Sequence, residues 1–299
     1  MKVNLVSRDN GVGLTHDMGL LEGILIPAGH QTLRVDWRSP SMPKCDVAIF
    51  LELFNPNLAR YARGMVGIFN LEWFLPRWRP YLPRFKQLWA KSREAEGVYQ
   101  RLGLRNHRYT GFLTRDLYDP TVPRELRVFH LAGHSKLKNT EAAIKAWQDH
   151  PGMPPLTIVS NNDYTVPPGV TLLGRQTDGR IKQLMNSHQI HLCPSRTEGW
   201  GHYITEGLST GAVVLTTDAS PMNEHVHPNG MALIPPASSV PRGRVAEHTV
   251  SPKAIAAAVE WAASLSDTER GRIDQQARTH TAARNAAFTE TALSLLRRI

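Results

Sequence analysis

Cysteine is scarce in this sequence: Cys45 and Cys193 are the only two among 299 residues. Two thiols cannot build a disulfide framework or a zinc cluster, which excludes the small disulfide-rich secreted classes. Long apolar runs are also lacking, since runs such as residues 47–51 stop after a few positions and a membrane-spanning helix needs about 20. The first residues form no extended apolar signal region. We therefore expect a protein of the reducing cytoplasm that does not cross a membrane.

Positive charge is concentrated in one stretch, residues 60–115. This stretch holds twelve basic and three acidic residues, which accounts for the whole net charge of +9. Two explanations are open: a solvated basic face above an aromatic core, or a surface for a polyanion, with nucleic acid first and an anionic membrane surface second. Aromatic residues that would stack on bases are interleaved with the charges: Trp73, Phe74, Trp78, Tyr81, Phe85, Trp89 and Tyr99.

Apolar runs alternate with helical periodicity along the chain, which predicts an α/β fold with parallel sheets. Near the start, a strand over residues 3–7 is followed by a turn at Gly11 and Gly13 and then a helix. Prolines at positions 76, 80 and 83 predict a loop. Further strands are expected over residues 45–51, 65–70, 105–110, 126–131, 156–160, 170–173, 190–193 and 212–216, and helices over 92–102, 140–148, 178–187 and 203–210.

The alternation is interrupted around residues 116–125, where two X-Pro steps mark a boundary. We expect a Rossmann-like domain over residues 1–120, a second over 121–280, and a C-terminal helix over 281–299, with a cleft between the two domains. Ligands of such sheets bind at the carboxyl ends of the strands. No repeat or low-complexity tract is visible.

The most informative segment, residues 194–208, reads PSRTEGWGHYITEGL. It places Glu198 in a glycine-rich loop after a strand and Glu206, eight positions later, on the following helix. The amides of Gly201, His202 and Tyr203 would open that helix, and such an N-terminus binds phosphate through free N–H groups and the helix dipole. A helix-capping loop explains Glu206 alone but not the combined pattern of glycines, aromatics and carboxylates.

This segment resembles the E-x7-E signature of retaining GT-B glycosyltransferases, especially glycosyltransferase family 4. The similarity covers roughly residues 126–235, and over residues 1–115 it is only topological. It implies two Rossmann-like domains, a nucleotide-sugar donor and retention of configuration. The flanking segments that share it are residues 133–139 (GHSKLKN), 172–175 (LLGR), 190–195 (IHLCPS), 211–214 (GAVV), Asn223-Glu224 and Asn229-Gly230.

The resemblance implies roles for individual residues in the second domain. Lys138 matches the lysine that neutralises the donor diphosphate, Glu206 the glutamate on the ribose, and Glu198 the glutamate beside the transferred sugar. The arginine that accompanies this lysine in the family is missing, so His134 or Lys136 is expected to substitute. Further donor contacts implied by the resemblance are the backbone of Gly201, His202 and Tyr203, and Arg175 near the base.

In the first domain the family carries a histidine over the sugar, at a strand end that here reads Asn70-Leu71-Glu72. Glu72 is our candidate for that role, with His16 on the first helix as the alternative. The loop of Gly11 and Gly13 lets a ligand approach the backbone closely. Because no Asp-x-Asp motif or cluster of metal-ligand residues occurs, we expect no metal and no cofactor: Lys138, neighbouring cations and helix amides would stabilise the leaving diphosphate.

Three classes of function compete for this pattern: a glycosyltransferase, an inactive GT-B-like module that binds nucleic acid, and a glycoside hydrolase. The two glutamates and Lys138 favour the transferase. For the acceptor we favour a hydroxymethylated base in DNA over an envelope glycan or lipid-linked acceptor. The sequence does not name the sugar, the acceptor atom or the oligomeric state. The residues that we expect to contact a nucleic-acid acceptor are Arg77, Trp78, Arg79 and Arg84.

Overall fold

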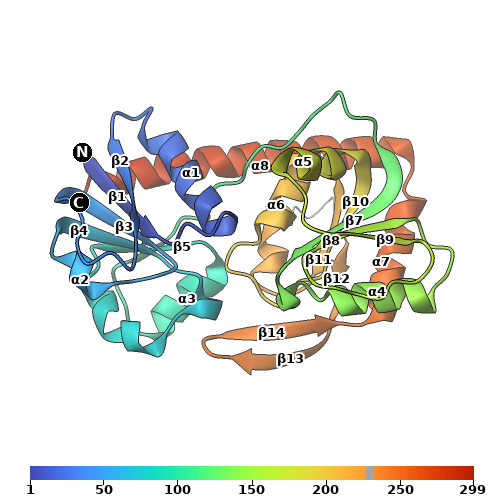
Figure 1. Cartoon of the computed structure of the whole chain (residues 1–299), viewed down its shortest axis with the longest axis horizontal. Helices are drawn as coiled ribbons and strands as arrows, with labels where there is room; N and C mark the ends of the chain where they lie inside the picture. Colours follow the sequence, from blue (N-terminus) through green and yellow to red (C-terminus); the bar gives the residue numbers. More distant parts are fainter. Residues whose placement is uncertain (227–231) are drawn as a thin grey trace. The chain divides into compact units, whose positions relative to one another are not determined.

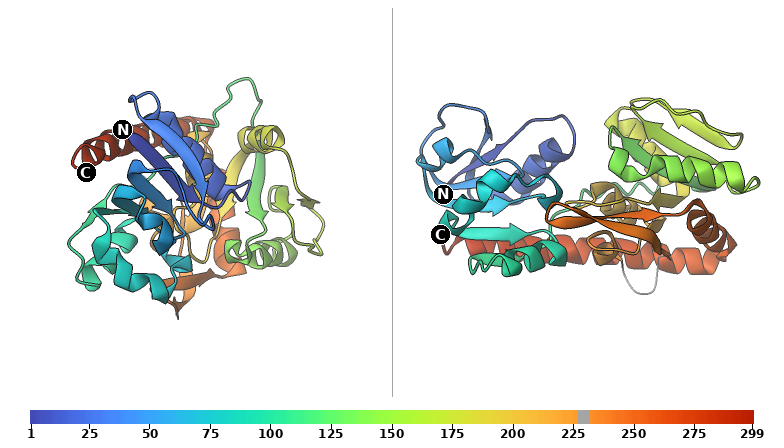
Figure 2. Two further views of the ribbon diagram at one scale, coloured as in Figure 1. Left: turned by 60° about the vertical axis from the view of Figure 1, so that its left-hand side comes forward. Right: turned by 90° about the horizontal axis from the view of Figure 1, so that it is seen from below.

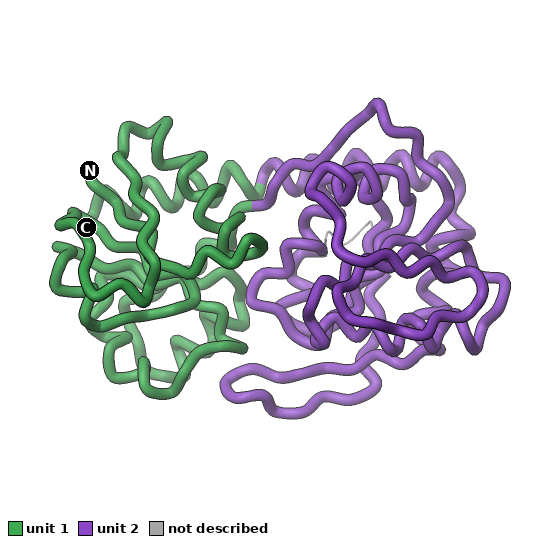
Figure 3. The backbone as a smooth tube through the Cα atoms, in the orientation of Figure 1, with its two compact units in different colours: residues 1–113, 284–299 green, residues 114–283 purple. Residues whose placement is uncertain are grey.

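The computed structural model describes residues 1–226 and 232–299. It divides into two compact units, one of residues 1–113 with 284–299 and one of residues 114–283 (Figure 3). Each unit contains a six-stranded parallel sheet with helices, which confirms the expected α/β class (Figure 1). The first boundary lies seven residues before the expected position, and the C-terminal residues 284–299 form part of the first unit.

The sheet of unit 1 has the strand order β2-β1-β3-β4-β5-β6, and all its pairings are parallel. The chain leaves β1 towards β2 on one side, and β3 to β6 continue on the other, so β1 and β3 flank the topological switch point. The helices are α1 (Gly13–Leu25), the single turn α2 (Pro56–Ala59) and α3 (Arg93–Arg101). The strands are β1 (Lys2–Ser7), β2 (Gln31–Asp36), β3 (Cys45–Leu51), β4 (Ala62–Ile68), β5 (Gln87–Ala90) and β6 (His107–Tyr109).

Proline-rich residues 76–84 form a 3₁₀ helix, η2 (Pro76–Arg84), where the sequence predicted a loop. Pro80 and Pro83 are three residues apart and fit its short turns, although they would interrupt an α-helix. This segment supplies part of an aromatic core, in which the ring of Trp78 stacks on Phe69 at 6.4 Å and meets Phe74 edge-on at 5.6 Å. The aromatic residues of the basic stretch are therefore largely core residues.

The sheet of unit 2 has the order β12-β11-β10-β7-β8-β9, again with parallel pairings. From β7 the chain proceeds to β8 and β9 on one side, whereas β10 to β12 lie on the other, so the switch point is between β7 and β10. The helices are α4 (Thr140–Asp149), α5 (Asp178–Ser187) and α6 (His202–Ser209). The strands are β7 (Glu125–Gly133), β8 (Leu156–Ser160), β9 (Val170–Leu173), β10 (His188–Cys193), β11 (Val213–Thr217) and β12 (Leu233–Ile234).

Residues after β12 form an antiparallel hairpin of β13 (Pro236–Arg242) and β14 (Val245–Val250), separate from the six-stranded sheet (Figure 2). Helix α7 (Pro252–Ser264) packs against α4. The long helix α8 (Asp267–Leu296) begins in unit 2, and its last turns belong to unit 1, where Phe288 meets the rings of Trp89 and Phe112 edge-on. Among the described helices, none is long and apolar enough to cross a membrane.

Most predicted elements match the structure closely. The strand over 45–51, the strands over 156–160 and 170–173 and the helix over 178–187 have the expected ends. Strand β2 and the hairpin were not predicted, because β2 is largely exposed at a sheet edge and β13 carries two prolines. Of the segments that carry the family resemblance, Asn229-Gly230 lies outside the described residues.

Candidate functional site

The site of unit 2 begins at the topological switch point, where ligands of open parallel sheets bind. The loop after β7 leads into a 3₁₀ turn, η3 (Lys136–Lys138), and the loop after β10 leads into α6. The two loops are joined directly, since the Arg196 backbone N–H donates to the Leu137 carbonyl at 2.8 Å. Residues 60 positions apart, Lys138 and Glu198, are thereby brought to one place.

Lys138 and Glu198 form the centre of this site. The Lys138 Nζ lies 2.5 Å from Glu198 Oε1 and 3.6 Å from the ring centroid of Tyr203. The Ser195 hydroxyl donates to the same Glu198 oxygen at 2.5 Å and lies 2.5 Å from the Tyr203 hydroxyl. Burial raises the pKa of Tyr203 well above its usual value, so its hydroxyl keeps its proton. One ammonium, one carboxylate and two neutral hydroxyls thus converge.

Helix α6 starts directly beside this cluster. Gly201 caps it with φ at +86°, a left-handed conformation that glycine adopts without steric strain. The first amides of α6 therefore project from its N-terminus, as the sequence predicted, with the partial positive charge of the helix dipole. Gly207 lets α6 approach the sheet, because a Cβ there would lie 2.7 Å from the ring of His191.

Glu206, the second glutamate of the signature, is 2% exposed and faces Arg115. The Arg115 Nε donates to Glu206 Oε1 at 2.6 Å, and its Nη1 lies 3.6 Å from Asp178 Oδ2. In the sequence, Arg115 is only one of the twelve basic residues of the stretch 60–115. No local pattern links it to Glu206, which is 91 positions away and joined only by the tertiary fold.

Two buried histidines support the loops without carrying charge. His130 bonds to the Leu192 carbonyl and the Thr140 hydroxyl, and burial lowers its pKa to about 4. His191 bonds to the Met185 carbonyl, and burial lowers its pKa to about 3. Both imidazoles are neutral at pH 7, so the basic charge of this region comes from lysine and arginine.

The β13–β14 hairpin is tied to the loop that carries Glu198. The His248 backbone N–H donates to the Arg196 carbonyl at 2.7 Å. The carboxylate of Glu247 pairs with two guanidinium groups, with Arg196 Nε at 2.8 Å and Arg242 Nη1 at 3.0 Å. This support was not predicted, because the hairpin itself was not.

The remaining donor-site candidates lie on loops. His134 and Lys136 are exposed on the loop after β7, and Arg175 is exposed just after β9. These positions place all three at the carboxyl edge of the unit 2 sheet. In unit 1, Gly11 has φ at +66° in the loop after β1, where its N–H donates to Asp9 and Thr15.

The other candidates of unit 1 also lie near carboxyl ends of strands. Gly13 and His16 occupy the first turn of α1, and the His16 N–H donates to the Val12 carbonyl at 2.9 Å. Glu72 lies in a short 3₁₀ turn, η1 (Leu71–Trp73), after β4. Both His16 and Glu72 have side chains of intermediate exposure.

The four residues expected to contact an acceptor divide into two groups. Arg77, Arg79 and Arg84 are exposed on η2, whereas Trp78 is 3% exposed. Because both neighbouring rings pack on Trp78, its faces are not available for stacking on a base in this structure. The ring exposed nearby is Trp73, at 51%.

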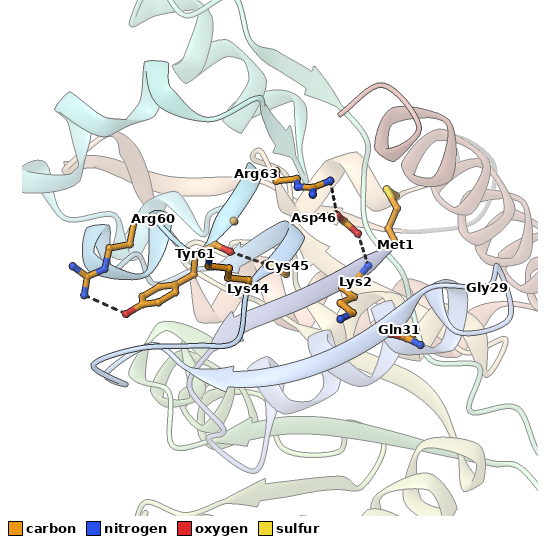
Figure 4. Close-up of a pocket in the computed structure, with 11 residues that line it drawn as sticks. Met1, Lys2, Gly29, Gln31, Lys44, Cys45, Asp46, Arg60, Tyr61 and Arg63 are labelled. Carbon is orange, nitrogen blue, oxygen red and sulfur yellow. Dashed lines mark hydrogen bonds and ion pairs between the residues drawn. The ribbon is translucent and has the colours of Figure 1, made fainter.

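A pocket of about 640 Å³ lies on unit 1, lined by residues at the amino ends of β1 to β4 (Figure 4). Its basic side chains include Lys2, Lys44 and Arg60. Its one carboxylate, Asp46, accepts from the Lys2 backbone N–H at 2.8 Å and pairs with Arg63 at 3.4 Å. This pocket is at the opposite end of the strands from the switch point.

Within residues 1–226 and 232–299, no group of three or more histidine, cysteine, aspartate or glutamate side chains is arranged to hold a metal ion. Lys138 and the α6 amides are among the electropositive groups at the unit 2 switch point.

Comparison with known proteins points to one class. Residues 161–280 match the family model described as glycosyl transferases group 1, a range that contains Glu198 and Glu206. Among curated proteins, none matches this sequence.

Three solved structures are similar over 99–100% of this chain. A glycosyltransferase from Rickettsia africae ESF-5 has a TM-score of 0.77 at 12% identity, with 99% of this chain and 98% of that one covered. Anabaena Alr3699/HepE, in complex with UDP and glucose, has a TM-score of 0.74 at 15% identity, with both chains fully covered. Sucrose-phosphate synthase from Thermosynechococcus elongatus has a TM-score of 0.74 at 13% identity, covering 100% and 98%.

These likenesses extend across both units and confirm the fold expected from the signature. The chain therefore has the GT-B fold, and its residues 161–280 match the glycosyl transferases group 1 family.

Proposed function

We propose that this GT-B glycosyltransferase moves a sugar from a nucleoside-diphosphate sugar to a hydroxyl acceptor, with retention of configuration. The observation that carries the proposal is the meeting of Lys138, Glu198 and the N-terminus of α6 at the switch point of unit 2. A cation and the amides of a helix N-terminus suit a diphosphate, and a carboxylate beside them suits sugar hydroxyls. Anabaena HepE, one of the similar structures, is bound to UDP and glucose.

The residues act on charge that develops as the glycosidic bond breaks. The leaving diphosphate gains negative charge, which Lys138 and the amides of His202 and Tyr203 would stabilise more strongly in the transition state than in the ground state. Glu198, held by the Ser195 hydroxyl, would accept hydrogen bonds from the transferred sugar. Glu206 would bind the ribose, with Arg115 orienting its carboxylate. Protein cations thus take the place that a metal occupies in Asp-x-Asp enzymes.

For the acceptor we propose a hydroxymethylated base in DNA. The support is the basic stretch 60–115, whose exposed arginines Arg77, Arg79 and Arg84 lie together on η2. Arginines of this kind position a nucleic-acid backbone. An envelope glycan or lipid-linked acceptor is the alternative, because the same charge would face an anionic lipid surface.

A transfer assay tests the reaction and the acceptor together. Radiolabelled UDP-, GDP- and TDP-sugars are incubated with DNA containing hydroxymethylated pyrimidines, with unmodified DNA and with a lipid-linked sugar. We expect label to enter only the modified DNA. Label in the lipid fraction alone would contradict the DNA acceptor, whereas the proposed transferase activity would stand. No transfer or hydrolysis with any donor would contradict the proposed function.

Lys138→Ala is the matching variant of the site. Since the lysine acts where charge develops, its loss should lower kcat about 100- to 1,000-fold, with little change in secondary structure. The control is Lys145→Ala, which removes an exposed lysine of α4 paired with Asp149. Steady-state donor hydrolysis and circular dichroism give the two readouts. Wild-type turnover in Lys138→Ala would remove this residue from the reaction.

A further inference from the structure

The backbone of unit 1 is strained at one residue, Glu52, directly after β3. Its φ is +62°, in the left-handed region that side-chain-bearing residues rarely adopt. The Leu53 N–H donates to the Leu51 carbonyl at 2.6 Å across it, so Glu52 is the central residue of a three-residue turn. A turn of this kind with positive φ is the rare, strained form of the γ-turn.

Neighbouring groups hold this strained turn in place. The Glu52 N–H donates to the Ile68 carbonyl of β4 at 2.9 Å, and the buried Ser7 hydroxyl of β1 donates to the Leu51 carbonyl at 3.0 Å. Strain that its surroundings fix so firmly is characteristic of functional positions.

The side chain of Glu52 is also unusual, because it is a partly buried carboxyl. Its Oε2 accepts from the Asn70 amide at 2.7 Å, and burial raises its pKa above the ordinary value. The charged groups that act on it come from three other segments: Asp17 of α1, which raises its pKa, and Lys91 after β5 and Arg8 after β1, which lower it. Asp17 and Lys91 are themselves paired at 2.8 Å and are 2–3% exposed.

The position of Glu52 in the sheet connects the strained turn with ligand binding. β1 and β3 flank the switch point of unit 1, so Glu52 lies where an open parallel sheet binds its ligand. A glycine would form the same turn without strain, and a neutral side chain would avoid the burial penalty. Glu52 is an ionisable residue in spite of the backbone strain and the burial penalty. This combination indicates a role in binding.

We propose that Glu52 binds the acceptor: its carboxylate accepts a hydrogen bond from the hydroxyl that receives the sugar. Asn70 fixes the carboxyl, and the Asp17–Lys91 pair sets its electrostatic surroundings. This inference rests on the proposed function and adds to unit 1 an acceptor residue that is separate from Glu72 and His16, the candidates above for the place beside the transferred sugar. It requires a hydroxyl-bearing acceptor, whether DNA or glycan.

Glu52→Gln is the decisive variant, because its side-chain oxygen still accepts from Asn70. Transfer to hydroxymethylated DNA and to a lipid-linked sugar should fall about 10- to 100-fold, the value of a hydrogen bond to a charged group. Donor hydrolysis and calorimetric donor affinity should not change. The wild-type transfer rate should fall at low pH, as Glu52 takes up a proton. This fall should be absent from the pH profile of the variant.

Stability provides a readout that a structural residue would not give. A carboxyl whose pKa is raised by folding destabilises the folded state as pH rises through its unfolded and then its folded pKa. Glu52→Gln should therefore melt at or above the wild-type temperature at pH 7.5, and the gain should vanish near pH 4. Glu52→Gly, which also removes the strain, should be stable and equally poor in transfer. Glu22→Gln on α1, a surface carboxylate paired with Arg34, is the control.

The measurements on the Glu52 variants separate an acceptor role of this residue from a structural one. Wild-type transfer by Glu52→Gln, or a loss of donor affinity equal to the loss of transfer, would overturn the acceptor role. A lower melting temperature with unchanged kinetics would make Glu52 a structural residue. Failure of the proposed function has a different signature, since wild type would then neither bind nor hydrolyse any nucleotide sugar, and both proposals would fall.

Discussion

At the scale of single residues, the unit 2 site consists of oppositely charged pairs that the chain separates widely. Lys138 meets Glu198, and Arg115 meets Glu206, in both cases with short charge-assisted contacts in a partly buried setting. Such pairs hold side chains in position but add little net stability, since desolvation offsets attraction. Their value here is therefore orientation of the carboxylates.

The Arg115–Glu206 pair can be tested by a double-mutant cycle. Glu206→Ala should weaken donor binding about 10-fold or more, as expected for one charged hydrogen bond, and should also destabilise the fold because it leaves the Arg115 guanidinium without this partner. Arg115→Ala should have a smaller effect on donor affinity. Calorimetry with UDP-sugars and urea unfolding of the four proteins should give a coupling of roughly 0.5–3 kcal/mol. Additive effects on stability would show that the pair is not coupled.

At the scale of elements, the β13–β14 hairpin supports the donor loop without supplying a predicted donor residue. Glu247 links it to Arg196, whose N–H is bonded to the loop after β7. Three segments that are distant in sequence are thus joined beside the Lys138–Glu198 pair: the loop after β7, the loop after β10 and the hairpin. Rigid positioning of this kind matters most where reacting groups must be held closely.

Glu247→Ala is the test of this support. It removes the carboxylate that pairs with both Arg196 and Arg242, so the loop of residues 194–201 should become more mobile. We expect weaker donor binding and faster amide hydrogen exchange in that loop. The matched control is Glu141→Ala on α4, which removes an exposed glutamate. Unchanged exchange in residues 194–201 would show that the hairpin does not position the loop.

At the scale of the whole molecule, charge is distributed unevenly: the stretch 60–115 carries the entire surplus of +9. The structure places most of its aromatic residues in the core, including Trp78, Trp89 and Tyr99. The exposed arginines of η2 remain available to a polyanion, but base stacking by Trp78 does not accompany them in this structure. Any nucleic-acid affinity of this stretch therefore rests mainly on phosphate contacts.

Salt dependence measures such contacts. Binding of duplex DNA should weaken with salt with a log–log slope near −0.9 for each phosphate contacted. Replacing Arg77, Arg79 and Arg84 by alanine should flatten the slope by roughly two to three units, while donor affinity is retained. A triple variant of exposed basic residues in unit 2, Arg180, Lys253 and Arg272, has the same net charge and should keep the slope. Equal slopes for both variants would show that η2 is not part of the DNA-binding surface. Binding of the protein to vesicles that increases with their anionic lipid content would favour the lipid acceptor.

The sequence by itself determined the α/β architecture and the segment of the unit 2 site that runs from Glu198 to Glu206. Apolar runs and helical periodicity are local properties, so strands such as 45–51 and 156–160 and the helix over 178–187 were predicted with their ends. The spacing of Glu198 and Glu206 is local too, because both lie within one loop and the helix that follows it. The family resemblance then assigned Lys138, which the fold brings to Glu198.

Only the tertiary structure decided which distant residues meet. The pairing of Arg115 with Glu206, the support of the donor loop by Glu247 and the burial of Trp78 depend on strand order and packing, which no local pattern encodes. Glu52 is the clearest case: it follows an apolar strand like an ordinary loop residue. Its strained turn arises only because β1 and β4 hydrogen-bond on either side of it. Long-range contacts set these conformations, since their energies outweigh the local preferences that a sequence displays.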